Sequence, residues 1–363
     1  MMVGGFLGAG KTTAVLVIGK LLKEKGLSVG LITNDQSIGL VDTALLRSQG
    51  FATEEISGGC FCCRFNSLVQ ASENLSTEDR PLIFIAEPVG SCTDLRATVS
   101  YPLQRIYGDQ FLVAPLSVVI DPIRLRRILG LESGKTFSPK VLYIYSKQLE
   151  EADILVINKC DLLSGEELAQ LEAVLKERYP EKSIMRITAR TGEGVEAWLD
   201  VLLENEAGQH DAMLVDYDEY ADGEAKLGWM NWSGLVAGDE FDGNALLTSL
   251  AGRIRESLKT QSIEIAHLKM TMMPDSGPDL AAGNLVQTEA KFELTYELAE
   301  PLDEGTLIIN LRAEGAPDVL QDVITAVIQD QMAASNLECT VHHLEAFRPG
   351  RPVPTHRYTD TTL

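Results

Sequence analysis

A phosphate-loop pattern near the first residue constrains this chain more than any other feature of its sequence. Residues 5–12 read Gly-Phe-Leu-Gly-Ala-Gly-Lys-Thr, which matches the spacing G-x-x-x-x-G-K-[ST]. The backbone N–H groups of such a loop surround phosphate oxygens, its lysine reaches the β- and γ-phosphates, and its threonine hydroxyl binds magnesium. The residues expected to make these contacts here are Gly5, Gly8, Ala9, Gly10, Lys11, Thr12 and Thr13.

The residues after the loop continue at helical period. Apolar side chains recur at positions 14, 15, 18, 21 and 22, and Gly26 ends the pattern. A helix that begins at the loop places its N-terminus against the phosphates. The four residues before Gly5 are fewer than the five or six of a usual buried strand. We therefore expect the true start of the protein to lie upstream of Met1.

Apolar runs alternate with helical segments as far as residue 200. Short runs followed by polar or glycine-bearing loops predict strands at 27–33, 81–86, 116–120, 154–157 and 183–187, and amphipathic patterns predict helices at 166–178 and 194–204. Such a βαβ series favours a parallel sheet. The expected fold class is α/β, a P-loop NTPase parallel sheet with helices on both faces, plus a smaller C-terminal α+β domain.

The pattern changes beyond residue 203. Residues 204–225 are acidic with little periodicity, and we interpret them as a linker or loop. The range 226–347 predicts a small α+β domain of split βαβ type, and residues 348–363 an extended tail. The expected strands of this domain are 227–236, 262–273, 285–298, 307–312 and 338–346, and its expected helices are 244–258 and 316–332. The nucleotide domain would then span residues 1–203.

Charge and cysteine content narrow the classes of partner and compartment. The formal charge of −22 argues against nucleic acid and against an anionic membrane surface. We find no apolar run of transmembrane length and no signal peptide, so we expect a cytoplasmic protein. Six cysteines in 363 residues do not resemble a secreted disulfide framework. Reduced thiols, some of them metal ligands, fit this composition better.

Residues 158–161 read Asn-Lys-Cys-Asp and follow the apolar run 154–157. In an N-K-x-D arrangement, the carboxylate of Asp161 can accept two N–H bonds from guanine, whereas adenine presents a mismatched edge. Alone, the tetrapeptide is usually a solvated turn, but the phosphate loop upstream makes it specific. We therefore expect Asn158, Lys159 and Asp161 at a guanine site, with Thr188 and Ala189 at the next strand end touching the base.

Glu87 and Gly90 end the predicted strand 81–86. A carboxylate and a glycine at this edge suit magnesium or water positioning beside the γ-phosphate, although a Pro-Gly turn would look the same. Lys11, Glu87 and Asp35 are the candidate catalytic groups. The sequence does not single out the residue that positions the attacking water.

Three cysteines stand within four residues, at Cys60, Cys62 and Cys63. Adjacent cysteines on a strand cannot both face one interior, so core packing is a poor explanation. Soft thiolates at this spacing suit zinc or copper(I), and a fourth ligand can be water, a carboxylate or a partner's residue. Inert or redox-active thiols are the alternative. We do not expect a second metal site at His210, which is isolated, or at the adjacent His342 and His343.

The phosphate loop, C-x-C-C, E-x-x-G and N-K-x-D occur in an order that resembles the CobW-like branch of the SIMIBI P-loop GTPases, relatives of the UreG and HypB metal-insertion proteins. The resemblance implies GTP hydrolysis coupled to delivery of a metal, most often zinc, or of a metallocofactor, to a client protein. It assigns metal binding to the three cysteines and γ-phosphate sensing to Glu87 and Gly90. Where the family has Asn-Glu after its second strand, this chain has Asn34-Asp35, and the shorter acid can still ligate magnesium.

Three hypotheses follow. The first is a slow GTPase that uses GTP, Mg²⁺ and Zn²⁺ and delivers a metal to a client metalloprotein. The second is a GTP-gated chaperone of a corrinoid protein, and the third is a P-loop kinase of a small molecule. The sequence leaves open the metal, the client and the oligomeric state, with a homodimer among the options.

Overall fold

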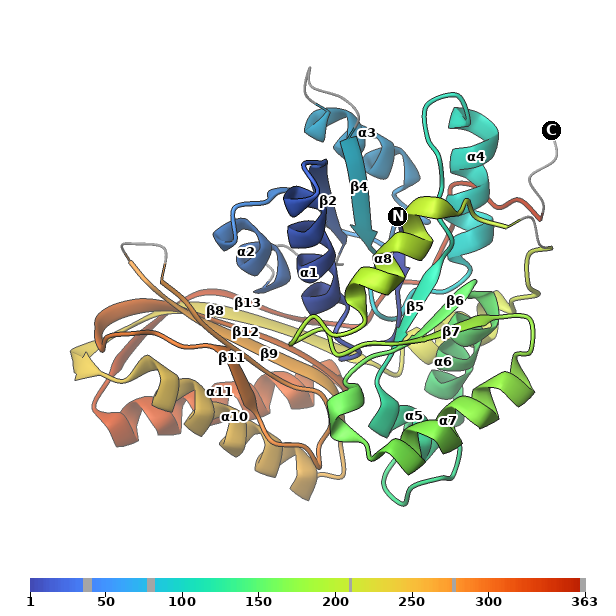
Figure 1. Ribbon diagram of the computed structural model, residues 1–363. Helices are drawn as coiled ribbons and strands as arrows, with labels where there is room; N and C mark the ends of the chain where they lie inside the picture. Colours follow the sequence, from blue (N-terminus) through green and yellow to red (C-terminus); the bar gives the residue numbers. More distant parts are fainter. Residues whose placement is uncertain (35–40, 77–81, 209–210, 276–278, 360–363) are drawn as a thin grey trace. The chain divides into compact units, whose positions relative to one another are not determined.

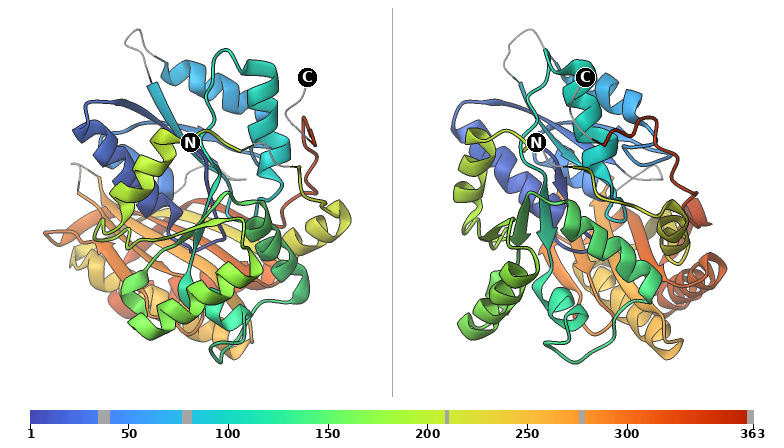
Figure 2. Two further views of the ribbon diagram at one scale, coloured as in Figure 1. Left: turned by 45° about the vertical axis from the view of Figure 1, so that its right-hand side comes forward. Right: turned by 90° about the vertical axis from the view of Figure 1, so that its right-hand side faces the viewer.

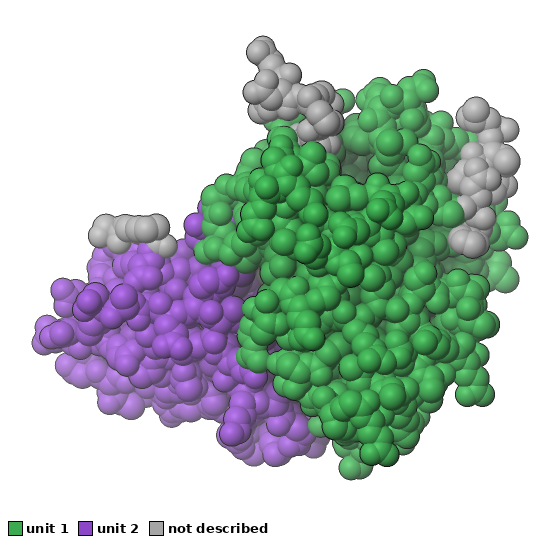
Figure 3. Space-filling model, in the orientation of Figure 1, with its two compact units in different colours: residues 1–38, 49–223, 351–363 green, residues 39–48, 224–350 purple. Residues whose placement is uncertain are grey.

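The computed structural model describes residues 1–34, 41–76, 82–208, 211–275 and 279–359. The chain divides into two compact units, coloured separately in Figure 3. Unit 1 comprises residues 1–38, 49–223 and 351–363, and unit 2 comprises residues 39–48 and 224–350. Neither unit is one uninterrupted range of the sequence. Residues 39–48 belong to the unit that is otherwise built from residues 224–350, and residues 351–363 belong to the unit built from the N-terminal part of the chain.

Unit 1 is built on parallel strands (Figure 1). One group has the order β3-β2-β4 and the other β1-β5-β6-β7, and a parallel bridge between Met2 and Ala86 joins them through β4. This confirms the parallel sheet predicted from the apolar runs. The strands are β1 (Val3–Gly4), β2 (Ser28–Asn34), β3 (Ala52–Ile56), β4 (Leu82–Glu87), β5 (Ser117–Ile120), β6 (Ile154–Ile157) and β7 (Ser183–Arg186).

Helices cover both faces of this sheet (Figure 2). The connections β1 to β2 and β3 to β4 cross the sheet in opposite directions, so right-handed crossovers place α1 and α3 on opposite faces. Helix α1 packs against α8. The helices of the unit are α1 (Lys11–Glu24), α3 (Phe65–Leu75), α4 (Tyr101–Tyr107), α5 (Pro122–Ile128), α6 (Pro139–Glu151), α7 (Gly165–Arg178), α8 (Val195–Glu204) and α9 (Tyr217–Glu224).

Helix α9 corrects one sequence prediction. The acidic segment after residue 203 was expected to lack regular structure, and that expectation is wrong at residues 217–224. Tyr220 is fully buried and its hydroxyl accepts the backbone N–H of Thr93 at 3.3 Å. Tyr217 and Tyr220, three residues apart, lie on the same side of the helix. Two aromatic anchors therefore fix a helix whose composition is otherwise acidic.

Unit 2 is a six-stranded antiparallel sheet of order β11-β10-β9-β12-β8-β13. The units β8-α10-β9 and β12-α11-β13 form the predicted split βαβ arrangement, with the β10–β11 hairpin added at one edge. The predicted strand range 285–298 is wrong in detail, because a turn separates β10 from β11. The elements are β8 (Gly228–Phe241), α10 (Gly243–Thr260), β9 (Glu264–Pro274), β10 (Ala281–Leu285), β11 (Glu293–Tyr296), β12 (Leu302–Glu314), α11 (Pro317–Ser335) and β13 (Glu338–Phe347).

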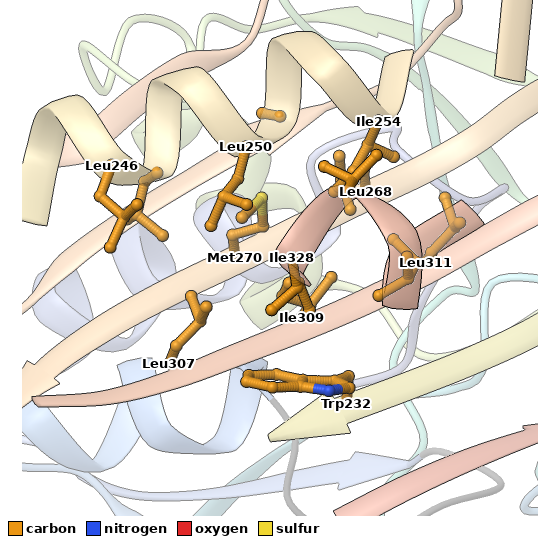
Figure 4. Close-up of a cluster of buried hydrophobic side chains, with 14 of the residues drawn as sticks. Trp232, Leu246, Leu250, Ile254, Leu268, Met270, Leu307, Ile309, Leu311 and Ile328 are labelled. Carbon is orange, nitrogen blue, oxygen red and sulfur yellow. The ribbon is translucent and has the colours of Figure 1, made fainter. Parts of the chain in front are cut away.

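The core of unit 2 lies between its sheet and helices α10 and α11 (Figure 4). Leu307, Ile309 and Leu311 of β12 contribute to it, so the alternation of a strand places Asn310 on the opposite face. There Asn310 Oδ1 accepts the N–H of Val41 at 3.2 Å. Val41 begins helix α2 (Val41–Ser48), which contacts β9 and β12. Helix α2 thus packs on the sheet of unit 2.

Among the described residues, none of the helices combines the length and the apolar character needed to cross a membrane.

Candidate nucleotide and metal site

The phosphate loop occupies the turn between β1 and α1. Gly10 has φ 93°, a conformation that favours glycine, and a Cβ at this position would overlap the Asn158 side-chain amide. Helix α1 begins immediately afterwards at Lys11, so the unpaired N–H groups of its first turn lie at the end of the loop. Such an arrangement stabilises an anion. The loop therefore has the geometry to hold phosphate groups.

Three side chains meet at the end of the phosphate loop. The Thr12 hydroxyl donates to Glu87 Oε1 at 3.0 Å, and Lys11 Nζ lies 4.0 Å from the same oxygen. All three residues are buried, with relative exposures of 6 to 7%. Hydroxyl and carboxylate oxygens are ligands that Mg²⁺ prefers. The fold thus brings Glu87, at the end of β4, to the first turn of α1, as the sequence predicted.

Arg124, which we did not single out from the sequence, also contacts the phosphate loop. Arg124, buried in α5, donates to the carbonyl of Leu7 at 2.7 Å, and its guanidinium lies 5.3 Å from the ring centre of Phe6. Gly90 also packs on the loop, since a Cβ there would approach Leu7 Cδ2 to 2.7 Å. The Glu87–Gly90 segment and the phosphate loop are consequently in direct contact.

The side chain of Asn158 braces the loop. Its Nδ2 donates to the carbonyl of Ala9 at 2.9 Å, and its Oδ1 accepts the N–H of Ala189 at 3.0 Å. Asn158 therefore joins the phosphate loop to the strand end that carries Thr188 and Ala189. Lys159 Nζ reaches the carbonyl of Gly8 at 2.8 Å from a left-handed backbone conformation with φ 55°. Both residues thus hold the phosphate loop in place.

Asp161, the expected guanine reader, is exposed at the surface of this site. Arg190 Nη2 donates to Asp161 Oδ2 at 2.8 Å. A guanine ring approaching Asp161 would meet Arg190 beside the carboxylate. The N–H groups of guanine would therefore compete with, or lie next to, this ion pair.

Asp121 is a site residue that the sequence prediction missed. It caps the N-terminus of α5, accepts the N–H of Arg124 at 2.9 Å, and accepts Lys159 Nζ at 2.7 Å. Burial alone would raise the pKa of Asp121, but the positive charges of Lys159 and Arg124 overcome burial and lower it. An aspartate followed by proline after an apolar run was the available sequence clue, because both residues favour a helix start.

Asp35, the third candidate catalytic group, lies outside the described residues. Asn34, its neighbour at the end of β2, is described and buried. Its Nδ2 donates to the carbonyls of Ile56 and Gly59 at 2.9 and 2.8 Å, and its Oδ1 accepts the N–H of Phe61 at 2.9 Å. Asn34 thus ties the end of β2 to the loop that carries the cysteines.

The three cysteines lie on a turn that leads into α3, not on a strand. The N–H groups of Cys63 and Arg64 donate to the carbonyl of Cys60 at 3.0 and 2.9 Å. This turn curls the thiols to one side, with Sγ separations of 2.8 Å between Cys60 and Cys62, 3.2 Å between Cys60 and Cys63, and 3.7 Å between Cys62 and Cys63. Within the described chain, these residues form a cluster able to hold a metal ion.

The thiols share their protons unequally. Hydrogen bonds from Cys62 and Cys63 lower the pKa of Cys60 well below its ordinary value. Hydrogen bonding to Cys60 raises the pKa of Cys62, and it raises that of Cys63 to about 11. Three cysteine sulfur atoms on one turn are soft donors of the kind that zinc binds, and metal binding releases the protons of the thiols. The donor set therefore fits zinc.

The C-terminal segment lies across the cysteine turn. The N–H of Val353 donates to Cys63 Sγ at 3.3 Å, and the N–H and hydroxyl of Thr355 donate to the carbonyls of Cys62 and Cys63 at 2.8 and 3.2 Å. Arg357 Nε then donates to Asp94 Oδ2 at 2.7 Å. We call residues 351–359 the strap, because they run over the thiols and are fastened at Asp94.

The histidines do not join the cluster where they can be located. His342 and His343 are exposed on β13, and the ring of His356 packs against those of Phe65 and Tyr358. His210 lies outside the described residues.

The chain was compared with known protein families and proteins. The family model described as the CobW/HypB/UreG nucleotide-binding domain matches residues 1–186. Zinc-regulated GTPase metalloprotein activator 1 of Dictyostelium discoideum is 28% identical over 219 residues, which are 52% of this chain and 45% of that protein.

Two bacterial relatives have similar identity. Zinc chaperone CobW of Sinorhizobium sp is 26% identical over 62% of this chain and 72% of its own length. Zinc chaperone YeiR of Escherichia coli K12 is 30% identical over 46% of this chain and 47% of its own length. The matches span about half the length of two of these three relatives.

Proposed function

The chain belongs to the CobW/HypB/UreG family, and from this premise we propose that it binds and hydrolyses GTP in the cytoplasm and delivers zinc to a client metalloprotein. The names of its relatives, which include two zinc chaperones and a zinc-regulated GTPase, support zinc as the cargo. One observation carries the proposal. A phosphate loop, an N-K-x-D motif and a three-thiol cluster occur in the same compact unit.

The residues would divide the work on GTP as follows. The N–H groups of the loop and Lys11 would hold the phosphates, while Asp161 would accept the guanine N–H groups. Thr12 and Glu87 would hold magnesium, which supplies charge neutralisation as the γ-phosphate leaves. Lys159 and Asn158 would keep the base site and the phosphate loop in register through their contacts with Gly8 and Ala9.

Slow turnover is part of the proposal. Glu87 is engaged by the Thr12 hydroxyl and lies beside Lys11, so it is poorly placed to act at the same time as a base toward water. Binding of GTP or GDP would be coupled to metal binding in two ways. The first is the segment from Glu87 to Gly90, which packs on the phosphate loop. The second is the hydrogen bond from Asn34, at the end of β2, to the loop that carries the cysteines.

Metal analysis of the full chain, purified without chelator, tests the cargo assignment. We expect one zinc ion per chain, its loss in Cys62→Ala, and its retention in Cys339→Ala, whose cysteine lies on β13 of unit 2. A nucleotide competition assay on the same samples should favour GTP over ATP. Preference for ATP would support a kinase instead, and an unchanged zinc content in Cys62→Ala would refute the thiol site.

A further inference from the structure

The strap is held against the rest of unit 1 in the manner of a bound peptide. The N–H of Val353 donates to Cys63 Sγ, and the N–H of Thr355 donates to the carbonyl of Cys62. Prolines on either side of Val353 favour an extended backbone here. Main-chain contacts of this kind give affinity for an extended segment largely regardless of its side chains. Another extended segment can therefore make the same contacts.

A buried carboxylate fixes the next part of the strap. Asp94 is 1% exposed, and its Oδ2 and Oδ1 accept Arg357 Nε at 2.7 Å and Nη2 at 3.4 Å. The Tyr217 hydroxyl donates to Asp94 Oδ2 at 2.7 Å, and Arg357 Nη2 also donates to the carbonyl of Met213 at 3.1 Å. A buried carboxylate is costly without a cation, and the planar guanidinium fits both of its oxygens. This position therefore selects an arginine.

Aromatic contacts flank the arginine. The ring of His356 packs edge-on against Phe65 of α3 at 5.1 Å, and the guanidinium of Arg105 lies 4.6 Å from the ring centre of Tyr358. The N–H of Tyr358 donates to the carbonyl of Ala97 at 2.9 Å. The strap thus runs beside α4, where the C-terminal segment is drawn in red in Figure 1. We call the surface under it the strap groove.

The strap covers the accessible side of the thiol cluster. Cys60 and Cys62 are buried, whereas Cys63 is partly exposed, and the strap contacts Cys63 through the N–H of Val353. An acceptor that collects a metal ion from these thiols has to approach from the exposed side and meets the strap there. The strap must therefore leave before a client can reach the ion, and its departure empties the strap groove.

We propose that the strap groove is the docking site of the client, which binds it through an extended segment whose arginine replaces Arg357 at Asp94. The inference rests on the proposed function, since the client is the acceptor of its metal. The formal charge of −22 favours a basic partner. The strap, as a tethered competitor at an effective concentration on the order of 1 mM, closes the groove until the client displaces it.

A labelled peptide with the sequence of residues 351–359 serves as the probe, and its binding to the metal-free full chain is measured by fluorescence anisotropy. Its affinity is reduced by the fraction of chains whose groove is closed. Arg357→Ala should therefore bind the peptide roughly fivefold more tightly than the unmodified chain. Arg351→Ala, which loses only an exposed ion pair with Asp218, should match the unmodified chain. Equal affinity in the unmodified chain and Arg357→Ala, or no saturable binding to Arg357→Ala, would overturn the proposal.

A second peptide, with alanine in place of Arg357, locates the contact. It should bind the Arg357→Ala chain roughly fivefold less tightly than the first peptide, since it lacks the attachment to Asp94. In Asp94→Asn the two peptides should bind equally. Asparagine tolerates the left-handed backbone of this position, where φ is 64°, and the thermal midpoint shows that the variant folds. A preference for the arginine peptide that persists in Asp94→Asn would overturn the proposal.

Two further measurements separate the outcomes. A chain that retains zinc but does not bind the peptide rejects the strap groove alone, whereas a chain that binds the peptide but no zinc rejects the proposed function and the client with it. Sedimentation reports the other possible occupant. A dimer of the unmodified chain that dissociates in Arg357→Ala would assign the groove to the strap of a second copy and overturn docking of a client.

Discussion

The Thr12 hydroxyl donates a 3.0 Å hydrogen bond to Glu87 Oε1, joining the first turn of α1 to the end of β4. The two residues are 75 positions apart in sequence, and the parallel sheet brings them together. Any ligand that binds to one of these oxygens also affects the other. Residues 87–94 continue from Glu87 and include Gly90, which packs on the phosphate loop, and Asp94, which binds Arg357 of the strap. We propose this segment as one route by which nucleotide and metal states influence each other.

Neutralising Glu87 should separate GTP binding from hydrolysis. We expect Glu87→Gln to bind GTP within a few fold of the unmodified chain but to hydrolyse it on the order of 100-fold more slowly, because one charged group at the transition state is lost. Single-turnover hydrolysis measures this effect. Glu73→Gln, an exposed position on α3, is the matched control. Unchanged hydrolysis in Glu87→Gln would assign the role to another residue.

Asp161 should determine the choice of base. We expect Asp161→Ala to reduce the preference for GTP over ATP by at least about 100-fold, because this carboxylate is the proposed partner of guanine's edge. Arg190→Ala should keep the preference, since Arg190 only accompanies the carboxylate. Competition binding with both nucleotides provides the measurement. Equal loss in the two variants would mean that the ion pair, and not the carboxylate, recognises the base.

Glu151 should make stability depend on pH. Burial, with the nearby charge of Asp94, raises its pKa from 4.5 to about 8. The folded protein then binds more protons than the unfolded chain between these two values, so stability falls as pH rises from 4.5 to 8, by up to ~1.4 kcal/mol per pH unit. Urea unfolding across this range should show that slope, and Glu151→Gln should flatten it. A variant as pH-sensitive as its parent would contradict this prediction.

The strap should protect the thiols. Arg357→Ala removes its attachment to buried Asp94, a contact we value at ~1 kcal/mol because Arg357 is partly exposed. The open fraction, and with it the alkylation rate of Cys63 in metal-free protein, should rise roughly fivefold. Arg351→Ala is the control, since its ion pair with Asp218 is exposed. Equal alkylation rates in both variants would show that the attachment at Asp94 does not close the strap.

Much of the fold was predictable because its elements follow simple periods. The βαβ order of unit 1 came from apolar runs, and β3 was missed because Glu54 and Glu55 interrupt its apolar pattern. The turn within 285–298 was not predictable because nothing in the composition of this range marks it. Helix α9 was missed because its acidic composition concealed the anchoring role of Tyr217 and of the buried Tyr220.

The site was predictable where its residues form motifs with fixed spacing. Asp121 and Arg124 were missed because each acts singly, and only the folded chain brings it to its partner. The contact of Val353 with Cys63 spans 290 positions. No local pattern indicates a contact at that range, because it depends on how the whole chain folds.

The central claim is that nucleotide state controls the hold on zinc. Its most direct test is the zinc affinity of the full chain, measured by chelator competition with a non-hydrolysable GTP analogue and Mg²⁺, and again with GDP and Mg²⁺. The account predicts affinities that differ by roughly 5- to 150-fold, the usual range of coupling between two sites. Cys62→Ala should bind zinc weakly in both states. Equal affinities in the two nucleotide states would contradict the account, even if zinc and GTP each bind.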